Sequence, residues 1–464
     1  MRESRRWVDA AATSFWLDQA GRPEPRARIS ADLDADLVVV GGGFTGLWTA
    51  LRAKEREPGR SVVVLEQDRL ASSASGRNGG FCAASLTHGD ANGRERWPEE
   101  MPLLRQLGMD NLGAIIDSIK RYEIDCGLEA TGQLDIATAP WQVRDLEDEA
   151  AALGSAGVEH RLLDAVELRE EFASPLGLAA LLDESGQVLV DPARLAWGLS
   201  QAIESLGGSL HEGVAVSRIE RRGAGVDVIC EGGRVRARKV VVATAAFPAL
   251  VRRTAGRVVP VYDYVLMTEP LSLSQLESIG WPRRRGVADA GNQFHYLRLT
   301  ADDRILFGGY EAVYRFGQRV DSRHDQDPAV FDQLEAHFDA MFPSLGSLGF
   351  SHRWGGAIDT STRFCASSTL SHGGAVATVN GFTGLGVAAS RFFANAAIDQ
   401  LDGIRSDATS TSLLQSAPLP FPPEPIRFLG IEATRRAIAR ADSNDGRRGP
   451  WLRLLDALGL GFDS

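Results

Sequence analysis

The 464-residue chain has few cysteines, no long apolar run and no stretch dominated by basic residues. Its cysteines are scattered and form no Cys-x-x-Cys pair, which argues against a disulfide framework or a zinc ribbon and fits a reducing cytoplasm. They are Cys82, Cys126, Cys230 and Cys365. No run of about 18 apolar residues exists, so we expect no membrane span. The basic start lacks the apolar core of a secretory signal, and we expect a cytoplasmic protein.

Basic residues are outnumbered: 50 Lys and Arg face 61 Asp and Glu, and the net charge is −11. This balance argues against nucleic acid or an anionic membrane as the main partner. Hydrophobic residues make up 44% and charged residues 24%, as in ordinary globular proteins. Single cores stop growing near about 250–300 residues, so the length predicts two or three domains. The function must come from motifs.

A strand, a helix and a second strand follow one another within about 30 residues near the start of the chain. Residues 36–40 (Asp-Leu-Val-Val-Val) have the pattern of a strand buried on both faces. Residues 44–57 follow as a helix closed by Pro58-Gly59, and residues 61–66 as a second buried strand. The segment predicts a βαβ unit with parallel strands.

The turn between the first strand and its helix is rich in glycine and reads Gly41-Gly42-Gly43-Phe44-Thr45-Gly46. In G-x-G-x-x-G the first glycine permits the tight turn, the second admits a pyrophosphate, and the third lets the helix pack on the strand. Glu66 ends the next strand, 20 residues after Gly46, where a carboxylate can accept from ribose hydroxyls. An ordinary strand–helix turn is the alternative. The combination favours an adenine dinucleotide.

The rest of the chain alternates between helical and strand patterns. The first 30 residues read as an arm over the surface, and the segment after about 405 as a tail rich in Pro and Arg. A further helix over 191–206 has Asp191 as N-cap and Pro192 in its first position. Other expected elements are helices near 100–125, 328–342, from Val387 and at 431–440, and short strands over 209–243.

A second glycine-rich loop, Ala74-Ser75-Gly76-Arg77-Asn78-Gly79-Gly80-Phe81, lies about 30 residues after the first. Such a loop could bring amides and the Arg77 guanidinium close to a flat polar ring system. Residues 36–81 resemble the FAD-dependent amine and amino-acid oxidoreductases of the D-amino-acid oxidase superfamily. The loop at 75–80 is most similar to the gamma-glutamylputrescine oxidase-like branch.

The resemblance recurs in order along nearly the whole chain. Its further pieces are Val240–Ala245, Val258–Tyr262, Met267–Leu271, Phe307–Tyr310, Trp354–Gly356 and Asn380–Gly386. It implies an α/β (α+β) fold, in which a Rossmann-like FAD-binding domain carries an inserted mixed-sheet substrate domain, as in glutathione-reductase-2-like proteins. The expected parts are an arm at 1–30, an FAD-binding domain at 31–105, 184–250 and 352–404, a substrate domain at 106–183 and 251–351, and a tail at 405–464.

The resemblance also implies the chemistry and the residues that bind FAD. A substrate amine would lie against the isoalloxazine ring and pass a hydride to flavin N5, and the imine would hydrolyse in water. No catalytic acid or base is required, and none is assigned. The implied FAD contacts are Gly41, Gly42, Gly43, Phe44, Thr45 and Gly46 at the pyrophosphate, Glu66 at the adenosine ribose, Arg77, Asn78 and Gly79 at the flavin ring, and Gly381, Phe382, Thr383, Gly384 and Gly386 at its pyrimidine end. Further implied FAD contacts are Gln67, Ser75, Gly76 and Val216.

Arg77, Tyr264 and Trp354 are the side chains that we expect beside the substrate; no metal site is expected. Each has a structural alternative. Arg77 could be a surface arginine, and Trp354, followed by two glycines, could pack between domains. Tyr262 and Tyr264 face one side of a strand, in the core or in the pocket. His295 reads as a structural histidine.

Three departures from the family narrow the expected substrate. No cysteine fits the position from which sarcosine-type oxidases hold flavin covalently, so we expect non-covalent FAD. No lysine lies in residues 305–310, which leaves open whether O2 or another electron acceptor reoxidises the flavin. The arginine that clamps a substrate carboxylate would align near Ile358, and the nearest is Arg363. The lysine with a similar role is also missing, since Val387 and Ala388 stand there.

The sequence therefore predicts an FAD-dependent oxidoreductase that acts on a small primary or secondary amine. The alternative is an oxidase or dehydrogenase for D-amino acids, glycine or sarcosine. A flavin monooxygenase is a further rival, although its late Gly-Asp segment is replaced here by Asn380-Gly381-Phe382-Thr383-Gly384. A protein that keeps FAD only as a structural element is the non-enzymatic reading. Oligomeric state stays open.

Overall fold

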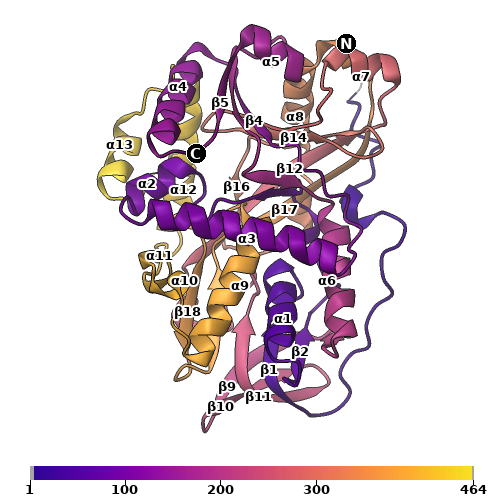
Figure 1. Cartoon of the computed structure of the whole chain (residues 1–464), viewed down its shortest axis with the longest axis vertical. Coiled ribbons are helices and arrows are strands. Elements are labelled where there is room, and N and C mark those ends of the chain that lie inside the picture. The colour runs from indigo at the N-terminus through magenta and orange to yellow at the C-terminus, as the bar shows by residue number, and fades with distance from the viewer. Residues whose placement is uncertain (1–4, 462–464) are drawn as a thin grey trace.

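Two large sheets divide the chain, and the computed structural model describes residues 5–461. In Figure 1 the first sheet fills the lower half and the second the upper half, with helix α3 (Met101–Arg121) crossing between them. The first sheet runs in the order β18 (Ser367–Ser371), β19 (Val376–Asn380), β11 (Gly233–Val242), β1 (Leu33–Val40), β2 (Val62–Leu65) and β8 (Ser209–His211).

The centre of the first sheet is parallel, as the βαβ pattern predicts. Strand β1 pairs in parallel with β2 on one side and with β11 on the other. Its residues Leu37–Val40 are buried because both faces are covered. One face packs on α1 (Phe44–Arg56), α6 (Pro192–Ser205) and α9 (Gly386–Asp402), and the other on the hairpin of β9 (Val216–Arg222) and β10 (Gly225–Cys230).

The second sheet is mixed and mostly antiparallel. Its order is β16 (Val313–Tyr314), β12 (Val258–Thr268), β15 (Ile305–Gly309), β14 (His295–Leu299), β13 (Gly286–Asp289), β4 (Gln133–Ala137), β6 (Ala179–Asp183) and β5 (Arg161–Asp164), with β17 (Phe350–Ser361) also on β12. Helix α8 (Pro328–Met341) packs on one face through Phe331 and Phe338. The opposite face of the sheet turns toward the first sheet and its glycine-rich loops.

Smaller elements complete the two halves. A two-stranded sheet joins β3 (Phe81–Ala83) to β7 (Gln187–Leu189). The remaining helices are α2 (Asp90–Arg96), α4 (Pro140–Ser155), α5 (Ala165–Glu171), α7 (Leu273–Ile279), α10 (Asp407–Ser410), α11 (Ser412–Gln415), α12 (Ile426–Asp442) and α13 (Pro450–Ala457).

The start of helix α6 lies where the N-cap pattern in the sequence predicts it. The Asp191 side chain accepts a hydrogen bond from the Arg194 amide over 3.0 Å, and Pro192 opens the helix. The helices at 328–341 and 386–402 also begin where the sequence predicts. The tail differs, because α12 extends to Ile426–Asp442 and is followed by a second helix, α13, that the sequence analysis did not predict.

Two segments pack across the expected domain boundaries. In the segment 106–121, expected in the substrate domain, Leu112, Ile115 and Ile119 of α3 pack in the hydrophobic core of α1 and α9. In the segment 352–361, expected in the FAD-binding domain, β17 pairs with β12 of the second sheet. Both segments cross between the halves, and their packing partners are distant in sequence.

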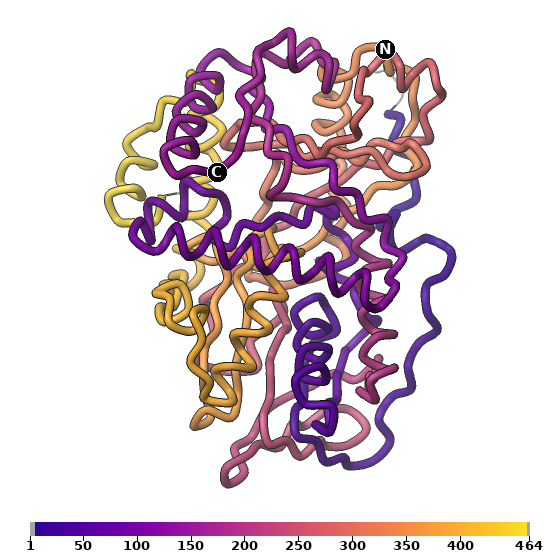
Figure 2. Tube along the Cα trace, viewed as in Figure 1, coloured from indigo at the N-terminus to yellow at the C-terminus, as the bar shows by residue number. Residues whose placement is uncertain are grey.

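The N-terminal arm lies over the surface and also makes buried contacts with both halves of the molecule. Figure 2 shows it passing from the second-sheet half along one side of the molecule to the first-sheet half before it enters β1. Trp7 packs against Phe331 and is buried. The Trp16 indole N–H donates to the Asn78 carbonyl over 2.9 Å, and the Ser14 hydroxyl donates to the Gly76 carbonyl over 2.7 Å. The arm therefore supports the second glycine-rich loop.

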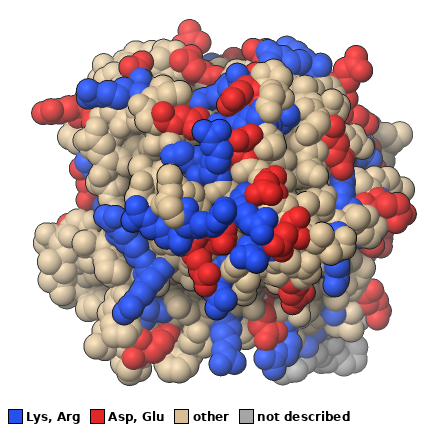
Figure 3. Space-filling view, turned by 90° about the horizontal axis from the view of Figure 1, so that it is seen from below, with Lys and Arg blue, Asp and Glu red and all other residues tan. Residues whose placement is uncertain are grey.

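The surface carries charges of both signs. On the face shown in Figure 3, Lys and Arg side chains form a band with Asp and Glu beside them. Arginines of β9 and β11 pair with neighbouring acids, for example Arg218 with Glu220 and Arg238 with Asp36. Over residues 5–461, none of the helices combines the length and the apolar character needed to cross a membrane.

Candidate active site

A cavity of about 1760 Å³ extends between the two sheets. The start of α1, the loop at 74–79 and the start of α9 line one wall, and strands of the second sheet line the other. Two long helices thus direct their N-terminal amides at one cavity, where those amides and the helix dipoles favour negative charge.

The glycines at the start of α1 are required by close packing. A Cβ on Gly41 would lie 2.4 Å from the Ala243 carbonyl oxygen, and one on Gly46 would lie 1.9 Å from the Gly41 oxygen. Gly41 also has a φ of +110°, which L side chains rarely adopt. Gly43, Phe44 and Thr45 line the cavity. This cradle fits the pyrophosphate of the dinucleotide that the sequence predicts.

Glu66 lies beside the glycine turn. Its carboxylate accepts from the Gly42 amide over 2.6 Å and from the Asp68 amide over 2.9 Å, and burial raises its pKa. The Glu66 carbonyl accepts from Val214, two residues before Val216. Gln67 is exposed. None of Glu66, Gln67 and Val216 is a cavity-lining residue, so their contact with FAD stays a prediction.

Arg77 is fixed between the two halves of the molecule. Its guanidinium forms an ion pair with Asp325 and donates to the Gly355 carbonyl over 3.1 Å and to the Ser72 carbonyl over 2.9 Å. Nη1 of Arg77 makes the ion pair, and only 27% of the side chain is exposed. Arg77 is therefore not the surface arginine considered as the alternative. Desolvation nevertheless raises the pKa of Asp325. Cavity-lining residues of this loop are Ser75, Arg77, Asn78 and Gly79; Gly76 is buried behind them.

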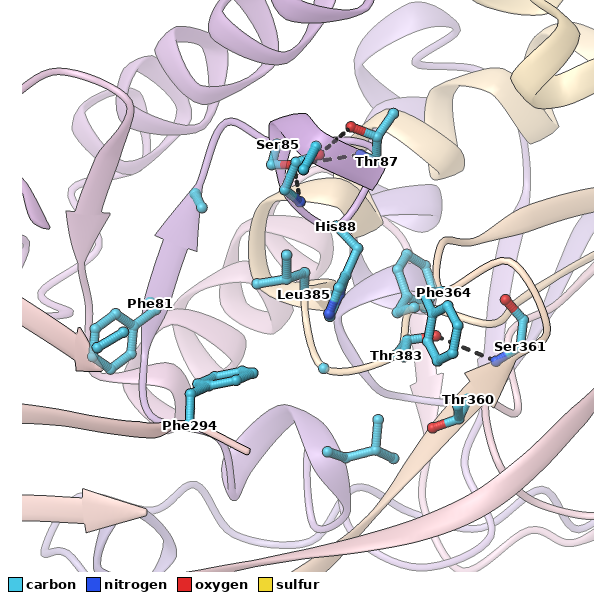
Figure 4. A pocket seen from close by; sticks show the side chains of 18 of the residues that line it. Phe81, Ser85, Thr87, His88, Phe294, Thr360, Ser361, Phe364, Thr383 and Leu385 are labelled. Carbon is cyan, nitrogen blue, oxygen red and sulfur yellow. Dashed lines mark hydrogen bonds between the residues drawn. The ribbon is translucent and has the colours of Figure 1, made fainter. Parts of the chain in front are cut away.

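The last glycine-rich loop is held by an acid beneath it. Asp359 on β17 accepts from the Gly381 amide over 2.6 Å, and the Thr383 hydroxyl accepts from the Ser361 amide over 3.2 Å (Figure 4). Burial raises the pKa of Asp359 to about 7. The residues of this loop that line the cavity are Phe382, Thr383, Gly384 and Gly386, whereas Gly381 lies outside it. The loop leads directly into α9.

Aromatic side chains surround the middle of the cavity. Figure 4 shows His88 projecting inward between Leu385 and Phe364, with Phe81 and Phe294 on the other side. Burial lowers the pKa of His88 to about 4, which keeps its imidazole neutral near pH 7. The space thus suits a flat ring with apolar faces.

Tyr264 and Trp354 lie in the structural positions that the sequence analysis gives as alternatives, and not beside the cavity. Tyr264 is fully buried in the core under α8, and its hydroxyl donates to the His324 carbonyl over 2.7 Å. Trp354 packs between the two halves with Trp16 and Trp197, and its indole donates to the Arg77 carbonyl over 2.8 Å. Neither lines the cavity. Alternation along a strand predicts that Tyr262 and Tyr264 share a face but not which face it is. In the structure that face packs on α8.

Sequence reasoning missed Asp263 and Tyr296, which line the cavity on the second-sheet wall. The Tyr296 hydroxyl donates to the Asp263 carboxylate. An acidic residue inside the strand run Val258–Thr268 was the available signal. His295, beside Tyr296, has the structural role that the sequence analysis expects. Its ring forms hydrogen bonds with Asp289 over 2.6 Å and with His337 over 2.9 Å.

The C-terminal tail forms an outer wall of the cavity. Its apolar lining residues are Ile426, Ile431, Ile438, Trp451, Leu452 and Leu455. The tail is fastened to the second sheet by ion pairs and hydrogen bonds: Arg435 to Glu311 over 2.7 Å, and the Tyr314 hydroxyl to Glu424 over 2.5 Å. Within the described chain, no cluster of three or more His, Cys, Asp or Glu side chains could hold a metal ion.

Comparison with known proteins agrees with this geometry. A family model described as FAD dependent oxidoreductase (DAO) matches residues 36–400. The chain is 35% identical over 354 residues to gamma-glutamylputrescine oxidoreductase of Escherichia coli (strain K12), over 74% of this chain and 78% of that protein. It is 22% identical to sarcosine oxidase subunit beta of Rhodobacter capsulatus, over 75% and 78% of the two chains.

Solved structures show the same fold. Glycine oxidase from Geobacillus kaustophilus superposes with a TM-score of 0.68 at 20% identity, over 83% of this chain and 99% of that one. L-proline dehydrogenase from P. horikoshii gives a TM-score of 0.65 at 18% identity, over 84% and 96% of the two chains. These likenesses show that the chain shares the α/β fold of the two solved structures.

Proposed function

The chain belongs to the family of FAD-dependent oxidoreductases, and on that premise we propose that it oxidises a C–N bond in a small primary or secondary amine. When bound, the flavin would supply the oxidising chemistry by accepting a hydride from the carbon beside the neutral amine nitrogen, and water would hydrolyse the imine to an aldehyde or ketone and release ammonia or an amine. The protein binds, orients and encloses the amine.

The observation that carries this proposal is the character of the wall around Ile358 and Val387. Both aliphatic side chains line the cavity, and they stand where the family resemblance implies basic residues that bind a substrate carboxylate. Arg363 turns away, because its guanidinium donates to the carbonyls of Ala366 and Leu413. Burial of a substrate carboxylate without a cationic partner is costly, so an amine without an α-carboxylate fits this wall better.

The arginines that do line the cavity within residues 5–461 are already engaged by oxygen partners. Arg77 pairs with Asp325, Arg94 with Glu149, Arg105 with Asp90, Arg427 with Gln318, Arg435 with Glu311 and Arg448 with Asp456. Similarity to gamma-glutamylputrescine oxidoreductase also supports an amine substrate. Oxidation of glycine, sarcosine or a D-amino acid is the alternative, in keeping with the similarity to sarcosine oxidase subunit beta.

Three regions of the chain have distinct roles in this proposal. The glycine cradle at α1 would bind the pyrophosphate. Arg77, Asn78 and Gly79 would contact the flavin ring. The amides at the start of α9, on the loop held by Asp359, would favour negative charge at the pyrimidine end of the flavin.

We also propose that FAD is bound non-covalently and that the protein works in the cytoplasm. All four cysteines are buried and free, and none of them lines the large cavity. Free thiols fit a reducing compartment. The electron acceptor is O2 or another oxidant.

Anaerobic flavin bleaching tests the proposed function without assuming an acceptor. The FAD-loaded protein is mixed with alkylamines, N-methylamines, polyamine derivatives and D-amino acids, and flavin absorbance is followed. Bleaching by an amine without an α-carboxylate is the expected result. Bleaching by amino acids alone would establish the alternative, and bleaching by NADPH would indicate a monooxygenase. No bleaching by any compound would refute amine oxidation.

A further inference from the structure

Asp263 is an acidic residue in the middle of β12, between two buried tyrosines. Side chains alternate along a strand, so Asp263 faces away from Tyr262 and Tyr264. Those two rings pack on the α8 side, with no exposed surface. Asp263 is half-buried and lines the cavity. The strand therefore presents one carboxylate to the cavity from the wall opposite the glycine-rich loops.

The surroundings of Asp263 place it close to the loop expected at the flavin ring. Asp263 pairs across the sheet with Gly356, and residues paired in this way share a face. A Cβ on Gly356 would lie 3.5 Å from the Cβ and Cδ of Arg77. The ring of Tyr296 lies on the same side, since a Cβ on Gly79 would approach it to 2.8 Å.

Tyr296 orients the carboxylate but leaves its charge in place. Its hydroxyl donates to Asp263 Oδ2 over 2.5 Å, and burial raises the pKa of this tyrosine well above 10, so it stays protonated. Burial raises the pKa of Asp263 to about 6, and the carboxyl is still mostly ionised above pH 7. The neighbouring cation, Arg77, is already paired with Asp325. A negative charge thus faces the cavity, and its hydrogen-bond donors, the Tyr296 hydroxyl and the Tyr264 and Gly309 amides, are neutral.

We propose that Asp263, oriented by Tyr296, binds the ammonium group of the substrate and holds its nitrogen beside the loop at 77–79. This inference rests on the proposed function and extends it to the class of substrate: amines that arrive as cations and lose one ammonium proton before a hydride leaves the adjacent carbon. A charge-assisted hydrogen bond in an enclosed site is stronger than one between neutral groups. The site would therefore prefer an ammonium ion to a neutral molecule of the same shape.

The preference can be measured with a pair of ligands that carry no hydrogen on the carbon beside the heteroatom and so cannot be oxidised. tert-Butylammonium and tert-butanol have nearly the same shape and differ in charge. Calorimetric titration of the FAD-loaded protein at pH 7.5 gives the dissociation constant of each. The wild-type protein is expected to bind the ammonium ion at least tenfold more tightly than the alcohol.

Asp263→Asn removes the charge and keeps the size of the side chain. It is expected to weaken tert-butylammonium binding by roughly tenfold to a hundredfold and to leave tert-butanol binding within about twofold. Asp302→Asn is the matched control, because Asp302 is a half-exposed carboxylate in the β14–β15 turn of the same sheet and does not line the cavity. It should bind both ligands as the wild type does. If Asp263→Asn does not fold, Asp263→Ser replaces it and is expected to show the same loss of tert-butylammonium binding with tert-butanol binding kept.

Equal binding of the two ligands by the wild-type protein would overturn the inference, as would an unchanged ammonium preference in the Asp263 variant. The bleaching screen reports on the proposed function separately. If no amine bleaches the flavin but the preference depends on Asp263, amine oxidation fails and ammonium recognition stands. If amines bleach the flavin and Asp263→Asn retains the preference, oxidation stands and this role of Asp263 fails.

Discussion

The indole N–H of Trp354 donates to the backbone carbonyl of Arg77 over 2.8 Å, and this bond joins the second sheet to the loop expected at the flavin ring. Trp16 of the N-terminal arm makes an equivalent bond to the Asn78 carbonyl over 2.9 Å. Two tryptophans from distant parts of the chain thus hold consecutive carbonyls of one loop. Both rings belong to the same buried cluster between the halves.

Trp354→Phe should weaken flavin retention, because it removes the donor and keeps most of the packing. Loss of one hydrogen bond to a buried carbonyl costs about 1–3 kcal/mol. Trp281→Phe is the matched control: Trp281 is buried in the core of the second-sheet half and donates to the Arg285 carbonyl over 3.0 Å. Thermal unfolding and FAD content of both variants are measured. Similar losses of FAD in the two variants would contradict a specific role for Trp354.

Arg77→Ala should slow flavin reduction by roughly tenfold or more, because the guanidinium lines the cavity, and it should also lower thermal stability, because it leaves the Asp325 carboxylate unpaired. Arg77→Ala combined with Asp325→Asn separates these effects by removing the unpaired carboxylate as well. Arg323→Ala is the control, since Arg323 forms an exposed pair with Asp321 in the same segment as Asp325. Normal reduction kinetics in Arg77→Ala, followed by stopped flow, would remove Arg77 from the site.

Asp359→Asn should flatten the pH dependence of stability between about pH 5 and pH 8. The folded pKa of Asp359, about 7, lies above the ordinary value of 3.8, so the folded protein holds the proton more tightly than the unfolded chain. The resulting stability is complete below the ordinary pKa and is lost as pH rises toward 7. Asp263 and Asp135, whose pKa values burial raises to about 6, act in the same direction.

Denaturant unfolding at pH 5 and pH 8 measures this effect. The wild-type protein should lose more stability between the two pH values than Asp359→Asn does. Asp302→Asn serves as the control, because the pKa of Asp302 is lowered instead and should not produce this loss. Equal pH dependence in Asp359→Asn and the wild type would show that the Asp359 carboxyl does not titrate in this range.

Acid precipitation should release the flavin. The cysteines are buried outside the cavity, and Cys365 lies behind the last glycine-rich loop, where its carbonyl accepts from the Ser361 hydroxyl. After denaturation and centrifugation the yellow colour is expected in the supernatant. Flavin that stays in the protein pellet through exhaustive washing would show a covalent bond, and peptide mapping would then identify the attachment residue.

Local sequence patterns were sufficient for the elements whose causes are local. The glycines at 41–46 and the cap at Asp191 determine their turn and helix through neighbours a few residues away. Asp263 could not be assigned in this way, because its face depends on pairing with β17, some 90 residues later. The same holds for Trp354 and Tyr264: alternation within a strand predicts which side chains share a face, but only the packing of α8 and of the arm decides which face lines the cavity.

The contribution of the C-terminal tail to the cavity could not be predicted from local sequence patterns either, and it can be tested. The family model ends at residue 400, yet α12 and α13 supply part of the cavity wall. A chain that ends after Ser416 keeps Leu413 and Leu414 in the core of the first-sheet half. We expect it to retain FAD and to lose discrimination between short and long amines, since the apolar outer wall is gone.

The measurement is KM for a series of amines of increasing chain length, with FAD content determined on the same samples. In the full-length protein KM should fall as the chain reaches Ile431 and Leu455, by up to about threefold to fourfold per buried methylene. The truncated protein should give a nearly flat series. Trp451→Ala removes one side chain of the same wall and should weaken the length dependence less than the truncation does. The hydrogen bond that it removes, from Trp451 Nε1 to Thr434, is exposed. A length dependence that survives the truncation would place the amine tail elsewhere in the cavity.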